Sequence, residues 1–291
     1  MLMAHPAGRL ERGYQMTKKA LIVGINLYAP PAGPDLEGCV NDAQNVAYTL
    51  NALHIVPARP ATMHIVTDQK ATKATILTQL GWLLKGAKKG DVLIYYHSSH
   101  GTQVADVEGD EIDHKDEALC PHDCATAGFI TDDILRGMFS KLPAGVNLDV
   151  ILDTCHSGSG TREFSTVNPG WKYRYMEPPL DYGFFLDADP NIPTKGILKP
   201  RAGQKAVAIA SINHVLWAAC RDNQTSAEAS IEGKPQGAFT YCFCKGLRAY
   251  GTDLTRRKLD GLVGQCIKKL GTPQIPQLEG TTLSMDEKVF C

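Results

Sequence analysis

The chain lacks the features that would point to membrane, nucleic-acid or nucleotide binding. No apolar run reaches the ~20 residues that a bilayer-spanning helix needs. Its 30 Lys and Arg residues against 31 Asp and Glu residues give a formal charge of −1, so nothing attracts the chain as a whole to nucleic acid or to an anionic membrane. The G-x-G-x-x-G fingerprint and the P-loop are absent, which makes a nucleotide-binding domain a remote alternative. We expect no nucleic-acid partner and no membrane partner.

A secretion signal is missing as well. Residues 1–17 contain no continuous apolar segment of the signal-peptide type. We expect them to form a loose tail, in which Met16 is an alternative start. The absence of a signal predicts a cytoplasmic location.

The nine cysteines form no dense framework of the kind that staples small secreted domains. Their odd number and the missing signal predict free thiols in a reducing compartment. Two short clusters could suggest zinc, but neither has the spacing of paired C-x-x-C motifs, so structural or incidental thiols are favoured. The clusters are Cys120, His122 and Cys124, and Cys242 with Cys244.

Buried strands alternate with amphipathic helices along the chain. Short, continuously apolar runs predict strands at 18–28, 61–68, 90–101, 147–154 and 204–212. Apolar residues at helical spacing predict helices at 38–54, 71–87, 130–142, 237–249 and 254–270. Thr131 precedes two acids and is the expected N-cap of the third helix. A sixth strand near the C-terminus is only weakly indicated.

This alternation is typical of a mostly parallel sheet covered by helices on both faces. Ligands of such sheets bind beyond the carboxyl ends of the strands. Three loops rich in reactive side chains follow predicted strands: "HSSHG", "DTCHSG" and "NHVLWAACRDNQTS". Residues 159–203 differ, because they are rich in Pro, Gly, Tyr and charge and show no period. We interpret this segment as an insertion between two halves of one sheet.

Cys155 and His100 follow two of these strands and form a candidate catalytic pair. A free thiol is a poor nucleophile until it loses its proton, which a nearby imidazole can accept and later deliver to a leaving amine. The backbone N–H groups of Gly101 and Cys155 could then hold a tetrahedral oxyanion. Taken singly, Cys155 is better explained as a small buried residue and His100 as a loop histidine. Together, at the ends of two buried strands, they favour a Cys-His dyad for acyl transfer.

A series of motifs in order resembles the metacaspases, which are caspase-like cysteine peptidases of clan CD, family C14. The motifs are "VGINLY", "GCVNDA", "YYHSSHGTQ", "EGDEID", "ITDD", "LDTCHSGSG" and "CRDNQTSAE". The resemblance implies a caspase-like three-layer α/β sandwich with a mostly parallel six-stranded sheet and helices on both faces. It also implies one peptidase domain at 18–291, divided into a large-subunit-like part (18–158), the insertion (159–203) and a small-subunit-like part (204–291).

The resemblance also implies roles for single residues. His100 matches the family's base and Cys155 its nucleophile. The primary specificity pocket of the family, which takes Arg or Lys, is matched by Asp42, Asp153, Cys39 and Ser98. Two carboxylates at the base of a pocket would attract a cationic side chain and penalise an anionic one. Asp222 is a further acid near the substrate groove, where a solvated loop charge is an equal alternative.

Calcium binding is a further property that the resemblance raises. Asp116, Asp132 and Asp133 match three calcium-ligand positions of the family, and oxygen ligands of this type suit a hard cation. The fourth position, seven residues after Cys155, holds Arg162, whose guanidinium cannot ligate calcium. This departure argues against a calcium requirement, and the proposed chemistry itself needs no cofactor.

A second departure concerns "HSSHG", in which Ser99 replaces a glycine of the family. If the position needs a positive φ, serine would be strained there. His97 and His156 are alternative imidazoles. We favour His100 because it precedes Gly101. His97 is expected to end the buried strand, and His156 to point away from its neighbour Cys155.

The leading interpretation is a monomeric cysteine endopeptidase that cleaves peptides or proteins after Arg or Lys. Such an enzyme could also cut itself in 159–203. That segment contains Arg162, Lys172, Arg174, Lys195, Lys199 and Arg201. The alternative is a weak or inactive caspase-like module that binds basic peptides without cutting them.

Overall fold

The computed structural model describes residues 16–105, 115–155, 170–177, 214–221 and 224–291. A six-stranded sheet, in the order β12-β9-β7-β3-β1-β2, forms its centre. Its strands are β1 (Lys18–Gly24), β2 (Met63–Thr67), β3 (Val92–Ser98), β7 (Asn147–Asp153), β9 (His214–Ala218) and β12 (Gln277–Glu279). Only β12 among these six runs antiparallel to its neighbour. The predicted mostly parallel six-stranded sheet is therefore confirmed.

The prediction of the fifth strand was wrong in position. The sheet position next to β7 is held by β9, which lies in the stretch assigned to a loop, whereas 204–212 is outside the described residues. Val215 and Trp217 of β9 are buried, whereas the alternate residues His214, Leu216 and Ala218 are only half-buried. This alternation over five residues is a weaker signal than the continuous apolar run before it, so the pattern favoured the wrong segment.

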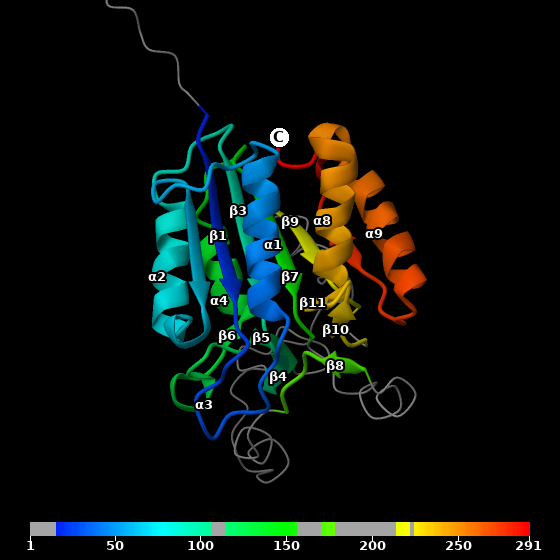
Figure 1. The fold of residues 1–291 in the computed structure, drawn as a ribbon. Helices are drawn as coiled ribbons and strands as arrows, with labels where there is room; N and C mark the ends of the chain where they lie inside the picture. Colours follow the sequence, from blue (N-terminus) through cyan, green and yellow to red (C-terminus); the bar gives the residue numbers. More distant parts are fainter. Residues whose placement is uncertain (1–15, 106–114, 156–169, 178–213, 222–223) are drawn as a thin grey trace, which may run out of the picture.

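Helices cover both faces of the sheet (Figure 1). One face carries α1 (Cys39–Ala52), α8 (Ala238–Tyr250) and α9 (Arg256–Leu270), and the other carries α2 (Lys73–Leu84) and α4 (Asp132–Phe139). The remaining helical elements are short: α3 (Cys124–Ala127), α10 (Thr282–Asp286) and the 3₁₀ turns at Asp68–Lys70 and Gly251–Asp253. Thr131 caps α4 as predicted, because its hydroxyl accepts the Ile134 N–H. The molecule is a three-layer α/β sandwich.

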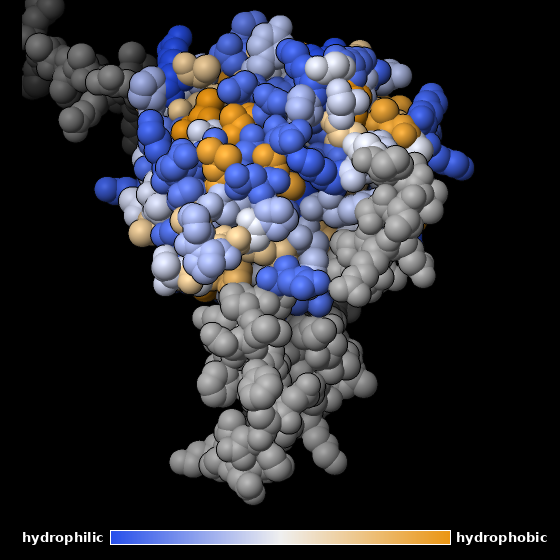
Figure 2. Space-filling model, turned by 60° about the horizontal axis from the view of Figure 1, so that its bottom comes forward, coloured by the Kyte–Doolittle hydropathy of each residue, from blue (hydrophilic) through white to orange (hydrophobic). Residues whose placement is uncertain are grey.

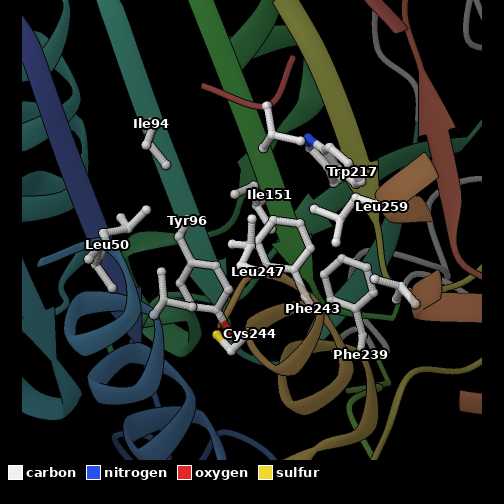
Figure 3. Close-up of a cluster of buried hydrophobic side chains, with 14 of the residues drawn as sticks. Leu50, Ile94, Tyr96, Ile151, Trp217, Phe239, Phe243, Cys244, Leu247 and Leu259 are labelled. Atoms are coloured by element: carbon white, nitrogen blue, oxygen red, sulfur yellow. The ribbon is translucent and has the colours of Figure 1, made fainter. Parts of the chain in front are cut away.

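The core under α1, α8 and α9 depends on aromatic packing against the sheet (Figure 3). The Trp217 ring of β9 lies edge-on to Phe243 of α8, with ring centroids 5.2 Å apart. Phe239 stacks on Phe243 at 5.7 Å. Leu50 of α1 and Leu259 of α9 are buried in the same cluster, and aromatic pairs of this kind stabilise beyond the area they bury. This packing fixes α8 against the sheet, and with it the N-terminus of α8.

Two small antiparallel sheets lie beyond the carboxyl ends of the central strands (Figure 1). One joins β4 (Gly101–Ala105), β5 (Lys115–Leu119) and β6 (Ile130–Thr131). The other joins β8 (Trp171–Tyr173), β10 (Ala227–Ile231) and β11 (Lys234–Gly237). In the described part of the surface shown in Figure 2, separate apolar groups lie among hydrophilic residues. No helix of the described part is both long and apolar enough to span a bilayer.

The prediction that all cysteines are free thiols was wrong. Cys242 of α8 and Cys266 of α9 form a disulfide, and the other seven cysteines are not disulfide-bonded. The two residues are 24 positions apart, and the packing of α8 on α9 brings their Cα atoms to 5.7 Å. Cysteine pairing depends on such helix packing, which the spacing of cysteines along the chain does not reveal.

Candidate active site

Two neighbouring strands carry His100 and Cys155 to the same edge of the sheet. Ser98 of β3 lies opposite Asp153 of β7 in parallel register, and each candidate catalytic residue follows two positions later. Both strands are largely apolar and almost wholly buried, so their ends are fixed by the core. His100 is 1% exposed and Cys155 is fully buried.

The His100 ring is oriented by a backbone carbonyl. Its Nε2 lies 2.8 Å from the Pro34 carbonyl oxygen, which can only accept a hydrogen bond, so the proton of a neutral ring resides on Nε2. Nδ1 is buried and has no hydrogen-bond partner among the described residues. The Tyr28 hydroxyl also fixes the segment by accepting the His100 backbone N–H at 2.7 Å. Burial lowers the pKa of His100, which favours a neutral ring with an available lone pair on Nδ1.

The Cys155 thiol lies beside a second thiol. Its Sγ is 3.4 Å from the Gln224 carbonyl oxygen, and the Sγ of Cys220 is 3.3 Å from the same oxygen. The two thiols therefore lie against the same carbonyl oxygen, at the edge of the sheet where β7 ends.

A buried arginine of the chain itself fills the acidic pocket next to this pair. Arg174 directly follows β8 and is fully buried. Its contacts are Asp42 Oδ2 at 2.5 Å and Glu228 Oε2 at 3.2 Å from one terminal nitrogen, and Asp153 Oδ1 and Ser98 Oγ, both at 2.9 Å, from the other. Three carboxylates and a hydroxyl therefore enclose one guanidinium. Its planar, diverging N–H groups can donate to all of these acceptors at once.

Backbone and side-chain donors fix two of the three carboxylates. Asp153 accepts the Ser226 hydroxyl and the Thr240 hydroxyl, each at 2.6 Å, and the Thr240 N–H at 3.2 Å. Thr240 lies in the first turn of α8, where the helix dipole also favours negative charge. Asp42 accepts the Gly237 N–H at 3.0 Å. The pocket is thus held in shape by its surroundings as well as by Arg174.

The charge state of the pocket depends on its occupant. Burial raises the pKa of Asp42 to about 7, with Arg174 lowering it and Asp153 raising it. Burial alone would lower the pKa of Arg174, but Asp153 and the other negative groups around it outweigh that influence. A buried acid with a perturbed pKa beside a cation is a feature of functional sites and of structural ion pairs alike.

The main chain around Arg174 is bound as an extended peptide. The Arg174 carbonyl oxygen accepts the Gly101 N–H at 2.8 Å, and the Arg174 N–H donates to the Ser226 carbonyl at 3.1 Å. On the next residue but one, the Met176 N–H donates to the Gly101 carbonyl at 3.0 Å. β8 continues this pattern by pairing with β10, Tyr173 opposite Ala227. The segment adds a strand to an existing edge, a common way to bind a peptide.

The structure brings together four of the residues assigned to the pocket from sequence. Asp42, Asp153 and Ser98 contact Arg174, and the Cys39 Sγ lies 4.0 Å from Glu228 Oε2. Asp222 lies outside the described residues, as do His156 and Arg162.

The neighbouring histidine and serine are structural. His97 is fully buried between the Tyr95 and Ser99 hydroxyls, at 2.9 Å from each. It was expected to end the strand, but β3 continues for one more residue, to Ser98. The Ser99 hydroxyl also donates to the His100 carbonyl at 2.7 Å. Ser99 does not adopt a positive φ, so the conditional expectation of strain does not apply.

The three acids matched to calcium ligands do not form a cluster. Asp116 is on β5, and Asp132 and Asp133 begin α4. Asp133 forms an ion pair with Arg136. Within the described ranges, no group of three or more His, Cys, Asp or Glu side chains is arranged to hold a metal ion. These residues as placed do not fit a calcium site, and no chemical step is derived through one.

Sequence reasoning missed three parts of the pocket. Arg174 is one of six basic residues of the insertion, and nothing in the sequence marks it as the pocket's occupant. Glu228 ends the motif "CRDNQTSAE" and lies on β10, which begins directly after Ser226; the motif by itself does not assign it a role. The sequence does not reveal the role of Gly237, because that role depends on how closely Asp153 approaches it in the fold. A Cβ at residue 237 would lie 2.4 Å from Asp153 Oδ2.

Comparison with known proteins shows which family the chain belongs to. The family model "Metacaspase, peptidase C14 domain" matches residues 18–162. The chain is 33% identical to Metacaspase-1 of Cryptococcus neoformans over 80% of its length and 32% identical to Metacaspase-1 of Ajellomyces capsulatus over 79%. The chain belongs to the metacaspase family. It spans 56% of the Cryptococcus protein and 71% of the Ajellomyces protein.

Solved structures show the same fold. The protein GSU0716 from Geobacter sulfurreducens superposes with a TM-score of 0.64 at 23% identity, covering 94% of this chain and 98% of that one. Caspase-1 from Spodoptera frugiperda superposes with a TM-score of 0.56 at 13% identity, covering 96% of this chain and 94% of that one. At these identities the comparison supports the caspase-like fold, and this metacaspase's activity is argued from its own site.

Proposed function

We propose that this metacaspase is a cysteine endopeptidase that cleaves peptide bonds after Arg or Lys. The observation that carries the proposal is Arg174, whose side chain fills a pocket of three carboxylates while its carbonyl oxygen accepts the Gly101 N–H. A substrate arginine bound in the same way would present its carbonyl carbon next to the edge that holds Cys155. An acidic side chain would be repelled from this pocket.

The proposed chemistry needs no cofactor. His100 accepts the Cys155 proton on Nδ1, and the thiolate sulfur forms a bond to the carbonyl carbon. The N–H groups of Gly101 and Cys155 stabilise the oxyanion. His100 then delivers the proton to the leaving amine as the carbon–nitrogen bond breaks. Water then hydrolyses the thioester: its oxygen forms a bond to the carbonyl carbon, the carbon–sulfur bond breaks, and one water proton goes to the sulfur. The new acid on the Arg or Lys releases the other proton and leaves as a carboxylate.

We also propose that the first bond cut is the chain's own Arg174–Tyr175 bond. The uncut chain blocks its own pocket, and hydrolysis of this bond would free Arg174 to leave. Of the six basic residues counted in the insertion, only two lie within the described part: Arg174, and Lys172, which is exposed and paired with Glu37. Calcium dependence, a monomeric state and a cytoplasmic location stay predictions.

Peptide cleavage tests the proposal directly. Short fluorogenic peptides ending in Arg, Lys or Asp are incubated with the wild type and with Cys155→Ala, with and without millimolar calcium. We expect cleavage after Arg and Lys that Cys155→Ala abolishes, because the nucleophile is lost. Cleavage after Asp would contradict the pocket. Binding of basic peptides without any cleavage would support the alternative, a binding module.

Intact mass and N-terminal sequencing of the same samples test self-cleavage. The wild type should yield a new N-terminus at Tyr175, and Cys155→Ala should stay whole. The matched variants are Arg174→Ala, which should remove this cut, and Lys172→Ala, which should keep it. A wild type that stays whole in every condition while cleaving Arg peptides would contradict self-processing but not the peptidase.

A further inference from the structure

Glu228 is the third carboxylate of the pocket, and it comes from a different part of the chain than the other two. Asp42 begins α1 and Asp153 ends β7, whereas Glu228 lies on β10, the strand that pairs with the peptide segment β8. Glu228 is 2% exposed. It therefore faces the bound side chain and not solvent.

Glu228 contacts one terminal nitrogen of the Arg174 guanidinium and not the other. That nitrogen is shared by Asp42 at 2.5 Å and Glu228 at 3.2 Å, while the other is shared by Asp153 and Ser98. The two forks of the guanidinium thus have separate acceptor pairs. Such two-sided recognition is available to Arg, whose terminal nitrogens diverge in a plane.

The position of Glu228 is fixed independently of the occupant. Its Oε1 accepts the Glu37 N–H at 2.8 Å, and its Oε2 accepts the Gly38 N–H at 3.1 Å. A Cβ at residue 38 would lie 2.9 Å from Oε2, so glycine there leaves room for the carboxylate. The Glu228 carboxylate is therefore preorganised to accept a hydrogen bond from the terminal arginine nitrogen that it shares with Asp42.

We propose that Glu228 determines the preference of the pocket for Arg over Lys. This inference rests on the proposed function of the same site. A Lys ammonium sits one bond closer to the main chain than the terminal nitrogens of Arg and has no second fork. Because Glu228 already lies at 3.2 Å from the Arg nitrogen, a Lys nitrogen falls beyond direct hydrogen-bond reach of it. Lys keeps the general attraction of the acidic pocket and loses this contact.

The test is the ratio of kcat/KM for two peptides that differ only in Arg or Lys before the scissile bond. In Glu228→Gln, the rate for the Arg peptide should fall about 10- to 100-fold, the effect of losing a hydrogen bond between charged groups. The rate for the Lys peptide should fall less, so the Arg/Lys ratio drops at least several-fold. Occupancy by Arg174 lowers both rates by the same factor and leaves the ratio unaffected.

Two further variants distinguish the position of the Glu228 carboxylate from its charge and from a general effect on the neighbouring loop. Glu228→Asp keeps the charge but withdraws the oxygens, so it should lower the ratio as well. Glu37→Gln, a change at an exposed neighbour paired with Lys172, should leave the ratio at its wild-type value. An unchanged ratio in Glu228→Gln, or equal losses for both peptides together with a lower melting temperature, would show that Glu228 merely supports the loop before α1.

Affinities of the same two peptides give a second readout that needs no turnover. They are measured in a protein that carries both Cys155→Ala and Arg174→Ala, which can neither cut nor fill its own pocket, with and without Glu228→Gln. A preference for Arg that disappears with Glu228→Gln supports the inference even if the wild type cleaves neither peptide, in which case only the proposed peptidase function fails. Equal binding of Arg and Lys peptides, or binding of neither, with Glu228 intact would overturn the inference.

Discussion

At the scale of single residues, the pocket is dominated by an imbalance of charge. Three buried carboxylates surround one buried guanidinium. Desolvating charges is costly unless each is paired, so an emptied pocket is less stable than an occupied one. When Arg174 leaves, the pocket can bind another cation, or one of its carboxylates can take a proton. Burial raises the pKa of Asp42 to about 7, so this acid can take a proton near neutral pH.

Asp42 therefore predicts a pH dependence of cleavage. Burial raises its pKa to about 7 even with Arg174 beside it lowering the pKa, so departure of the cation should raise it further. A protonated Asp42 attracts a basic side chain less, and kcat/KM reports the pKa values of the free enzyme, so kcat/KM for Arg peptides should rise with pH through a midpoint above 7. The pKa of His100 is lowered by burial, so its protonation begins at a lower pH.

In a pH–rate profile, Asp42→Asn should lose the upper limb and keep the lower one, with a reduced plateau. An upper limb that persists in Asp42→Asn would assign it to another group.

At the scale of elements, the N-terminus of α8 organises the pocket. Gly237 ends β11 and caps α8, and its N–H donates to Asp42. One turn on, Thr240 donates its N–H and hydroxyl to Asp153. The aromatic packing under α8 thus determines where two carboxylates are held, although Asp42 and Asp153 belong to other elements. A helix terminus is a natural place for anions, and here it fixes protein carboxylates.

Gly237→Ala should close the pocket from this side. The new Cβ would lie 2.4 Å from Asp153 Oδ2 and 2.7 Å from one Arg174 terminal nitrogen. Since φ is −70° at this position, alanine is compatible with the backbone, and the effect falls on the pocket contents. We expect kcat/KM for Arg peptides to fall about a hundredfold, the size typical of a displaced substrate.

Gly261→Ala is the matched control, because Gly261 lies exposed in α9 and a Cβ there meets nothing within 4 Å. It should leave the rate unchanged and raise the free energy of unfolding by about 0.5–1 kcal/mol. Wild-type rates in Gly237→Ala would contradict the close approach at the pocket.

At the scale of the whole molecule, sequence patterns predicted what depends on neighbours in the chain. The buried strands β3 and β7 are predicted from their largely apolar sequences, and parallel strands end at the same edge of a sheet. His100 and Cys155, which follow these two strands, do share an edge. The occupation of the pocket by Arg174 could not be predicted, because it depends on how the insertion folds back on β10. The Cys242–Cys266 disulfide was missed for the same kind of reason, since it follows from helix packing.

A buried ion pair links three parts of the fold far from the pocket. Arg256, at the start of α9, forms two hydrogen bonds with Asp149 of β7, at 2.9 and 2.8 Å. The Trp217 indole of β9 donates to the same carboxylate at 3.0 Å. Arg256 also donates to the Ser284 carbonyl of the C-terminal helix α10 at 2.9 Å. Helix, sheet and C-terminal segment are thus joined through one guanidinium.

Arg256→Met should therefore destabilise the whole molecule without changing the pocket. It leaves the Asp149 charge buried with Trp217 as its remaining described donor, a loss of about 3–5 kcal/mol for a broken buried pair. A urea unfolding curve should shift to a lower midpoint, while the Arg/Lys cleavage ratio stays at the wild-type value. Arg257→Met, one residue on, removes an exposed pair with Asp286 and should shift the midpoint little. Adding Asp149→Leu to Arg256→Met removes the buried charge and should recover part of the loss. If both single variants unfold at the same midpoint, the buried pair does not link these layers.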